Sequence, residues 1–248
     1  MRKVVAIIQA RMGSTRLSGK VMKDLFGKTV LDHVITRVKQ SEYIDEIVIA
    51  TTTLKRDNII VEEAKKCGVK YFRGSEDDVL SRYYYAAKEN NADIVVRITS
   101  DCPLIDPIVV DEIVKFYIEN DYEIVSNAGV DLSQRTYPRG LDTEVFSFEV
   151  LENAFKNAKE KYQREHVTPY IYENSKKIYY YKNDIDYSKY RWTLDTKEDF
   201  ELIREIYKYF YRGEHDFYSD QILNLMKKEP ELVKINENIE QKKIKSNS

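Results

Sequence analysis

Short apolar runs alternate with amphipathic stretches along the first half of this 248-residue chain. The runs predicted as strands lie at 4–8, 47–51, 69–72, 93–98 and 124–126. Helical periodicity marks the stretches between them, at 30–38, 58–67, 78–90 and 107–119. Strands that are apolar throughout must be covered on both faces, and their alternation with helices is typical of parallel sheets. The pattern therefore predicts a three-layer α/β fold with a mostly parallel sheet.

The second half of the chain is less regular. Strands are predicted at 143–148, 178–181 and 190–194, and helices at 148–161, within 163–174, at 197–210 and at 219–228. No internal repeat or linker divides the chain, so we expect one domain over residues 1–235. Residues 236–248 are polar and lysine-rich with little to bury, which predicts a disordered tail.

The first predicted strand leads into a loop of glycines, hydroxyls and cations, Gln9-Ala10-Arg11-Met12-Gly13-Ser14-Thr15-Arg16-Leu17-Ser18-Gly19-Lys20. Glycines let backbone N–H groups approach phosphate oxygens, and Arg16 and Lys20 can neutralise them. A Walker loop has four residues between its glycines and a hydroxyl residue after its lysine. Here five residues separate Gly13 from Gly19, and Val21 follows Lys20. The loop is thus predicted to bind a polyanion in another way; a simple polar turn is the alternative.

Two carboxylates follow predicted strands in distant parts of the chain. Asp101 comes shortly after the strand at 93–98, and Asp195 ends the strand at 190–194. Functional groups of open α/β sheets collect at the carboxyl ends of strands, and carboxylate oxygens suit Mg²⁺. The structural alternative is that Asp101 caps a turn. Thr196 is predicted as the N-cap of the helix at 197–210.

In combination, these segments resemble the spore-coat polysaccharide cytidylyltransferase-like proteins, relatives of the enzymes that make CMP-sialic acid and CMP-KDO. The matching segments are QARMGSTRLSGK (9–20), GSEDDVLSR (74–82), SDCPL (100–104), YPRGLDTEV (137–145), REHVTPY (164–170) and RWTLDTKEDF (191–200). The resemblance covers the chain to about Met226. It implies the nucleotide-diphospho-sugar transferase fold (Rossmann-like, GT-A type). It also implies transfer of a nucleotide monophosphate, CMP from CTP, to a sugar or sugar acid with release of pyrophosphate.

The resemblance also implies roles for individual residues. The catalytic residues would be Arg16, Lys20, Asp101 and Asp195, with Asp101 and Asp195 sharing one Mg²⁺. The nucleotide would contact Gln9, Ala10, Arg11, Gly13, Ser14, Asp78, Arg82 and Ser100. The acceptor would contact Arg139, Asp142, Glu144, Arg164 and His166.

Some of these assignments have structural alternatives. The segment around Asp78 can equally be a helix start capped by Ser75 or Asp77. A lone His166 near a helix start is more often a structural hydrogen-bonding group than a base. Arg139 stands where relatives often carry Asp, and its guanidinium suits a carboxylate or phosphate, which predicts an anionic acceptor. The alternative is an exposed arginine in a turn.

Composition narrows the function classes. The formal charge is −2, from 40 basic and 42 acidic residues, which argues against a nucleic-acid partner. Cys67 and Cys102 form no disulfide framework or metal motif, so we expect buried thiols and a cytoplasmic protein. The chain shows no signal peptide and no membrane span. A homodimer is left open.

The rival functions are a glycosyltransferase of the same fold and a non-catalytic nucleotide-binding protein. A glycosyltransferase typically carries an Asp-x-Asp motif after a strand, whereas Cys102 and Pro103 follow Asp101 here. Loss of a metal carboxylate would favour the non-catalytic protein, and both Asp101 and Asp195 are present.

Overall fold

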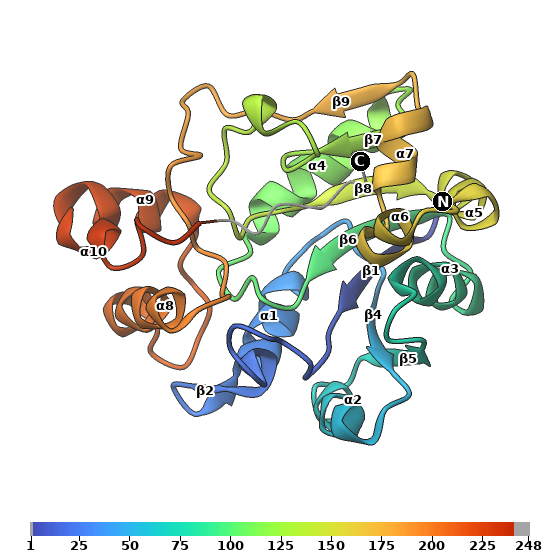
Figure 1. Cartoon of the computed structure of the whole chain (residues 1–248). Coiled ribbons are helices and arrows are strands. Elements are labelled where there is room, and N and C mark those ends of the chain that lie inside the picture. The colour runs from blue at the N-terminus through green and yellow to red at the C-terminus, as the bar shows by residue number, and fades with distance from the viewer. Residues whose placement is uncertain (1, 241–248) are drawn as a thin grey trace.

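A seven-stranded sheet forms the centre of the computed structural model, which describes residues 2–240 (Figure 1). The strands, in the order in which they lie side by side, are β5 (Lys70–Gly74), β4 (Glu46–Thr52), β1 (Val4–Gln9), β6 (Ile94–Thr99), β8 (Glu144–Ser147), β7 (Ile124–Ser126) and β9 (Ile178–Tyr180). β1 pairs in parallel with β4 and β6, whereas β8 runs antiparallel to β6 and β7. The predicted mostly parallel sheet is confirmed.

Helices cover both faces of this sheet. One face carries α1 (Val30–Val38), α2 (Asn58–Lys66), α4 (Pro107–Glu119), α8 (Lys197–Phe210) and α9 (Ser219–Lys228), and the other carries α3 (Val79–Glu89), α5 (Phe148–Asn157) and α7 (Pro169–Asn174). β1 shows why two layers are needed, because Val4, Ala6 and Ile8 pack into one core and Val5 and Ile7 into the other. A small hairpin, β2 (Asp24–Leu25) and β3 (Lys28–Thr29), precedes α1.

Local capping fixes the helix starts that position the site. The predicted N-cap Thr196 accepts a hydrogen bond from the backbone of Asp199, whose carboxylate accepts one in return from the backbone of Thr196. The predicted caps Ser75 and Asp77 for α3 are wrong. Asp78 caps that helix by accepting a hydrogen bond from the Ser81 N–H at 2.9 Å, while Ser75 supports the Asp78 backbone.

Two predictions in the second half need correction. Residues 190–194 form no strand; their ladder pairing is limited to a single bridge between Arg191 and Arg139, because the neighbouring segment is a loop. The helix predicted at 148–161 is broken after Asn157, and α6 (Lys161–His166) starts anew. The Gln163 side chain causes the break, since its Oε1 accepts hydrogen bonds from the backbone N–H groups of Lys159 and Glu160 at 3.1 Å.

The chain after α9 packs more closely than its composition suggests. α10 (Glu231–Lys234) precedes Asn236, which is only 4% exposed and donates hydrogen bonds to the Arg191 carbonyl and Asp199 Oδ1, both at 2.9 Å. The predicted disordered tail therefore begins too early at 236, and residues 241–248 of it lie outside the described part of the chain. Of the two free cysteines, Cys102 is buried as expected and Cys67 is half-buried.

A buried histidine pair joins α1 to the loop before α9. His33 Nδ1 and His215 Nε2 lie 2.7 Å apart, and His33 Nε2 lies 2.6 Å from the Leu25 carbonyl. The carbonyl only accepts, so His33 Nε2 carries a proton and neutral His33 Nδ1 accepts from His215. Two protonated rings could not share this contact. Burial lowers the pKa of His33 to about 4 and that of His215 to about 3.

This pair predicts a loss of stability in mild acid. Because both pKa values lie below the unfolded value of about 6.5, the stabilisation is complete above that pH and is lost as the pH falls toward 4. We expect the free energy of unfolding to fall by roughly 2 kcal/mol per histidine between pH 6.5 and pH 5. Urea denaturation at a series of pH values measures this. His215→Gln should flatten the slope in that window, and an unchanged slope would contradict the assignment.

Candidate active site

The side chain of Lys20 brings the two predicted metal carboxylates together. Its ammonium lies 2.6 Å from Asp101 Oδ2 and 2.7 Å from Asp195 Oδ1. These three side chains come from parts of the chain that are 81 and 175 residues apart, and all are largely buried. The catalytic residues predicted from the sequence therefore converge on one point.

Short segments at the carboxyl ends of two adjacent strands hold these groups. Lys20 opens a turn of 3-10 helix after Gly19, whose φ of 62° is a conformation that favours glycine. Asp101 follows β6, the neighbour of β1. The Leu194 N–H donates a hydrogen bond to the Asp101 carbonyl at 2.8 Å, which fixes the chain beside Asp195 against the segment after β6. Backbone contacts thus set the separation of the two carboxylates.

Asp195 is also bound by two arginines. Arg16 Nη2 lies 2.7 Å and Arg191 Nη2 lies 3.0 Å from its Oδ2. Arg191 is held in turn by Asp199, which is fully buried and contacts its Nε at 2.9 Å. Arg191 and Asp199 therefore orient Asp195 from behind, a role that the sequence analysis did not assign to either residue.

The charges in this cluster stabilise one another. Burial opposes the charged form of Lys20, but Asp101 and Asp195 outweigh it and raise the pKa of Lys20. Burial likewise works against ionised Asp101, yet the Lys20 ammonium holds the pKa of Asp101 below its usual value. The site is therefore a set of ionised groups at neutral pH.

The donor set fits a divalent cation. Oxygens from Asp101 and Asp195 already converge on a single positive charge, the Lys20 ammonium, at 2.6 and 2.7 Å. Hard cations such as Mg²⁺ are bound by one or two such carboxylates together with water and phosphate oxygens. These two residues could hold the metal once Lys20 has moved to another anion.

The predicted nucleotide-side residues lie at the end of β1 and in its loop, after β6 and at the start of α3, and their roles stay predictions. Gln9 is the last residue of β1, and Ala10 follows it. The Ser100 N–H donates a hydrogen bond to the Gln9 carbonyl at 3.2 Å. Ser14 is held by a backbone bond to Met12 at 2.9 Å. A Cβ on Gly13 would lie 2.9 Å from the ends of the Arg56 and Glu76 side chains, and Glu76 is also 3.9 Å from Arg11, so these charged side chains lie directly against the loop at Gly13.

Asp78 and Arg82 hold the α3 end of the site. Arg82 donates hydrogen bonds to the carbonyls of Ser75 at 2.6 Å and Glu76 at 3.2 Å, and its residue is only 1% exposed. Asp78 pairs at 2.6 Å with Arg164, a residue predicted for the acceptor side. All three side chains therefore bind other groups of the protein, and their predicted ligand contacts remain untested.

The predicted acceptor-side residues divide into two groups. Asp142 forms a two-pronged ion pair with Arg135 at 2.7 and 3.0 Å, and Arg135 holds the pKa of Asp142 low despite burial. Arg139 lies between Arg135 and Asp142 in the sequence, and its backbone pairs with that of Arg191. Glu144 lies apart from them, buried between Arg97, Thr168 and Tyr172. His166 ends α6, two residues before Thr168, whose hydroxyl donates a hydrogen bond to Glu144.

A further residue, missed in the sequence analysis, holds the loop that follows β1. Asp57 is fully buried; it accepts a hydrogen bond from the Met12 N–H at 2.7 Å and another from the Thr52 hydroxyl. The only local sign was an acidic residue just before the predicted helix at 58–67. Its partners lie in other elements, so spacing alone could not find it.

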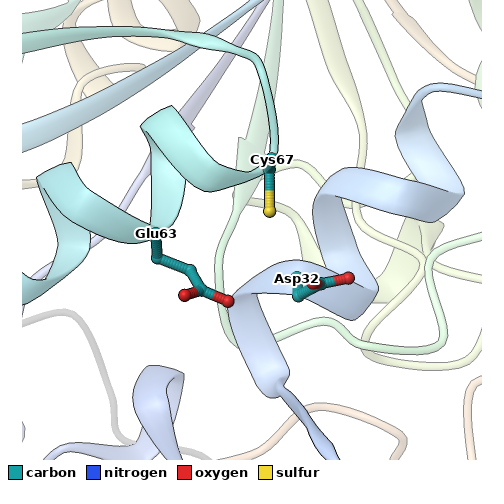
Figure 2. A group of neighbouring side chains, drawn as sticks. All are labelled: Asp32, Glu63 and Cys67. Carbon is teal, nitrogen blue, oxygen red and sulfur yellow. The ribbon is translucent and has the colours of Figure 1, made fainter.

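A second group of possible ligands lies between α1 and α2. Figure 2 shows Asp32, Glu63 and Cys67 near one another, with their donor atoms within 4.8 Å. Asp32 already accepts from Thr36 at 3.0 Å and Lys28 at 3.2 Å, and Glu63 accepts from Thr29 at 2.8 Å. Burial raises the pKa of the Cys67 thiol to about 11, so it stays protonated. This group is explained by helix packing.

Comparison with known proteins identifies the family. The profile of the family described as "Cytidylyltransferase" matches residues 5–242. The chain belongs to the cytidylyltransferase family. It is accordingly a nucleotidyltransferase enzyme, as the sequence resemblance implied.

Three similar proteins support this placement. The spore coat polysaccharide biosynthesis protein SpsF of Bacillus subtilis is 32% identical over 243 residues, covering 93% of this chain and 97% of that one. A cytidylyltransferase structure from Leptospira borgpetersenii matches with a TM-score of 0.88 and 38% identity, over 98% and 100% of the two chains. The structure of CMP:2-keto-3-deoxy-manno-octonic acid synthetase complexed with CTP matches with a TM-score of 0.63 and 20% identity over 84% of this chain and 99% of that one. This last likeness confirms the predicted fold.

None of the helices within residues 2–240 is both long and apolar enough to cross a membrane.

Proposed function

We propose that this protein transfers CMP from CTP to an anionic sugar or sugar acid and releases pyrophosphate, for the synthesis of a surface polysaccharide or glycoconjugate. The observation that carries the proposal is the convergence of Lys20, Asp101 and Asp195 beside the loop that follows β1. The CTP complex of the 20%-identical synthetase and the name of SpsF support the choice of nucleotide and pathway class.

The residues of the chain would act mainly by positioning and charge neutralisation, which carry most of the barrier in such transfers. The acceptor oxygen bonds to the α-phosphorus as the bond to the β-phosphate breaks, and the oxygen's proton, where it has one, is released. Lys20 leaves the carboxylates and, with Arg16, neutralises the departing pyrophosphate. Asp101 and Asp195 would hold Mg²⁺, which when bound would polarise the α-phosphate and orient the nucleophile.

Arg139 supports an anionic acceptor. Its backbone pairs with that of Arg191, and the Arg191 side chain contacts Asp195, so Arg139 lies one residue contact away from the catalytic cluster. A guanidinium there can form two parallel hydrogen bonds with a carboxylate or phosphate. A cytoplasmic location and a homodimer remain predictions.

A pyrophosphate-release assay tests this function. Each of the common nucleoside triphosphates is combined with sugar acids, sugar phosphates and their neutral counterparts, in the presence of Mg²⁺. We expect release with CTP and an anionic acceptor only. Consumption of a preformed nucleotide sugar, with no release from CTP, would favour the glycosyltransferase alternative.

A further inference from the structure

A small cavity lies between the C-terminal segment and the chain that leads into Asp195. Its volume is about 110 Å³, and its walls include Arg139, Lys189 and Arg191 on one side and Val233, Asn236 and Ile239 on the other. Figure 1 shows α9 and α10 beside α8, so the C-terminal segment returns toward the start of α8. Arg191 joins the cavity to the catalytic cluster through its contact with Asp195.

Cations outnumber anions along the described walls of this cavity, which include Arg139, Lys189, Arg191 and Glu237. Arg135 is paired with Asp142, and Arg191 with Asp195 and Asp199. The guanidinium of Arg139 makes no hydrogen bond or ion pair with any group in residues 2–240, although it is half-buried. Burial, with repulsion from Arg135 and Arg191, lowers the pKa of Arg139.

Two other charged residues line the same cavity. Lys189 is exposed and lies over the Tyr190 ring, 5.0 Å from its centroid, and Glu237 is an exposed carboxylate on the opposite wall. An exposed carboxylate is well solvated and compensates a half-buried cation only weakly. Asp142 acts on Arg139 electrostatically but is already paired with Arg135. Within residues 2–240, no carboxylate makes an ion pair with the Arg139 guanidinium.

The C-terminal wall is fixed in place. Asn236 is buried and donates to the Arg191 carbonyl and to Asp199 Oδ1, so the wall is tied to the residues that orient Asp195. The carbonyl of Glu240 lies 3.5 Å from Arg16 Nη1. The same segment therefore lies next to Arg16, the arginine that is predicted to neutralise pyrophosphate. This segment is thus part of the site rather than an appendage.

The size of the cavity limits what it can hold. Pockets for drug-sized ligands measure about 300–1,000 Å³, so 110 Å³ is too small for a whole sugar. It is several times the roughly 30 Å³ that one water occupies in the liquid. A carboxylate or phosphate group fits, and the rest of the molecule would lie outside the cavity.

We infer that this cavity binds the anionic group of the acceptor, a carboxylate or phosphate, on Arg139, and that residues 233–239 form the wall that selects it. The inference rests on the proposed function for the identity of the ligand as the acceptor. It adds that the C-terminal segment, which lies outside the motifs recognised in the sequence, determines acceptor specificity.

Direct anion binding is the first test, with inorganic phosphate and acetate as separate probes in calorimetric titrations. We expect Arg139→Leu to weaken binding of the preferred anion at least about tenfold, because charge-assisted hydrogen bonds are lost. Arg212→Leu, at an exposed arginine on the end of α8, is the matched control and should bind as the wild type does. Phosphate binding alone indicates a sugar phosphate, and acetate binding indicates a sugar acid. Equal affinities in the wild type and Arg139→Leu overturn the inference.

The wall is tested by Asn236→Ala against Asn238→Ala, a neighbouring exposed asparagine. Thermal melting first establishes that both variants are folded. We expect Asn236→Ala to weaken the binding of the same anion several-fold. Asn238→Ala should leave the affinity for that anion unchanged. If Asn236→Ala is unfolded, Val233→Lys, which places a second cation in the wall, replaces it and should strengthen anion binding. No change in either variant would overturn the role of the wall.

Steady-state kinetics separate this inference from the proposed function. Arg139→Leu should raise KM for the acceptor at least about tenfold and leave KM for CTP within about twofold. If the wild type does not use CTP while phosphate binding still depends on Arg139, the proposed function fails and the cavity is an anion site for another ligand. If Arg139→Leu alters both KM values equally, the cavity is not an acceptor site.

Discussion

Asp195→Asn is expected to lower kcat at least about a hundredfold while leaving the protein folded, and Asp101→Asn should behave similarly. A carboxamide is a poor ligand for a hard cation, and loss of even an outer partner of a metal ligand costs about 10- to 100-fold. The fold should survive because Asp199 still holds Arg191 in the asparagine variant. Turnover under limiting Mg²⁺, with thermal melting in parallel, measures both effects.

Asp220→Asn is the matched control for this experiment. Asp220 is an exposed carboxylate in the first turn of α9 and is not part of the site. It should retain wild-type turnover at every Mg²⁺ concentration. If Asp195→Asn or Asp101→Asn does the same, that carboxylate is not a metal ligand.

Lys20→Met is expected to change the affinities for metal and nucleotide in opposite directions. When the Lys20 ammonium is removed, Asp101 and Asp195 lose the cation that both contact. Mn²⁺ binding in the absence of nucleotide should therefore tighten at least about tenfold. CTP should bind at least about tenfold more weakly, because a charge-assisted contact to the triphosphate is lost. Electron paramagnetic resonance of Mn²⁺ and calorimetry of CTP measure the two affinities.

The same variant should be destabilised without metal. Two carboxylates that are 22% and 14% exposed would lose the cation that bridges them, although Asp195 keeps Arg16 and Arg191, and added Mg²⁺ should restore the melting temperature. Lys23→Met, at a lysine three residues along the same turn, should change none of these measurements. Equal Mn²⁺ affinity in the wild type and Lys20→Met would show that the ammonium does not compete with the metal.

Those parts of the fold that depend on local sequence could be predicted closely. α1, α4, α8 and α9 have the predicted bounds because periodicity and caps such as Thr196 act within one turn. The segment at 190–194 shows the limit. Its composition suits a strand, but a strand also needs a neighbour, and the neighbour here is the loop around Arg139.

The residues of the candidate site also divide into those that the local sequence indicates and those that it does not. Asp101 and Asp195 could be chosen because each follows a predicted strand, and Lys20 because it closes a cationic loop. Asp57 acts through a buried contact with Met12, 45 residues away, which no spacing in the sequence records. Arg191 and Asp199 lie close to Asp195 in the sequence, but their spacing does not show that the three side chains bind one another. Asn236 was assigned to a disordered tail because polarity was the only local evidence, whereas its burial depends on Arg191 and Asp199.

The most direct test of the proposed reaction follows the phosphates of CTP. Two samples of CTP, one labelled in the α-phosphate and one in the γ-phosphate, are incubated with the enzyme, Mg²⁺ and the anionic acceptor. We expect the α-label on the sugar product and the γ-label in pyrophosphate, with neither product formed by Asp195→Asn. Both labels remaining in CTP across the anionic sugars, while a nucleotide sugar is consumed, would contradict the account.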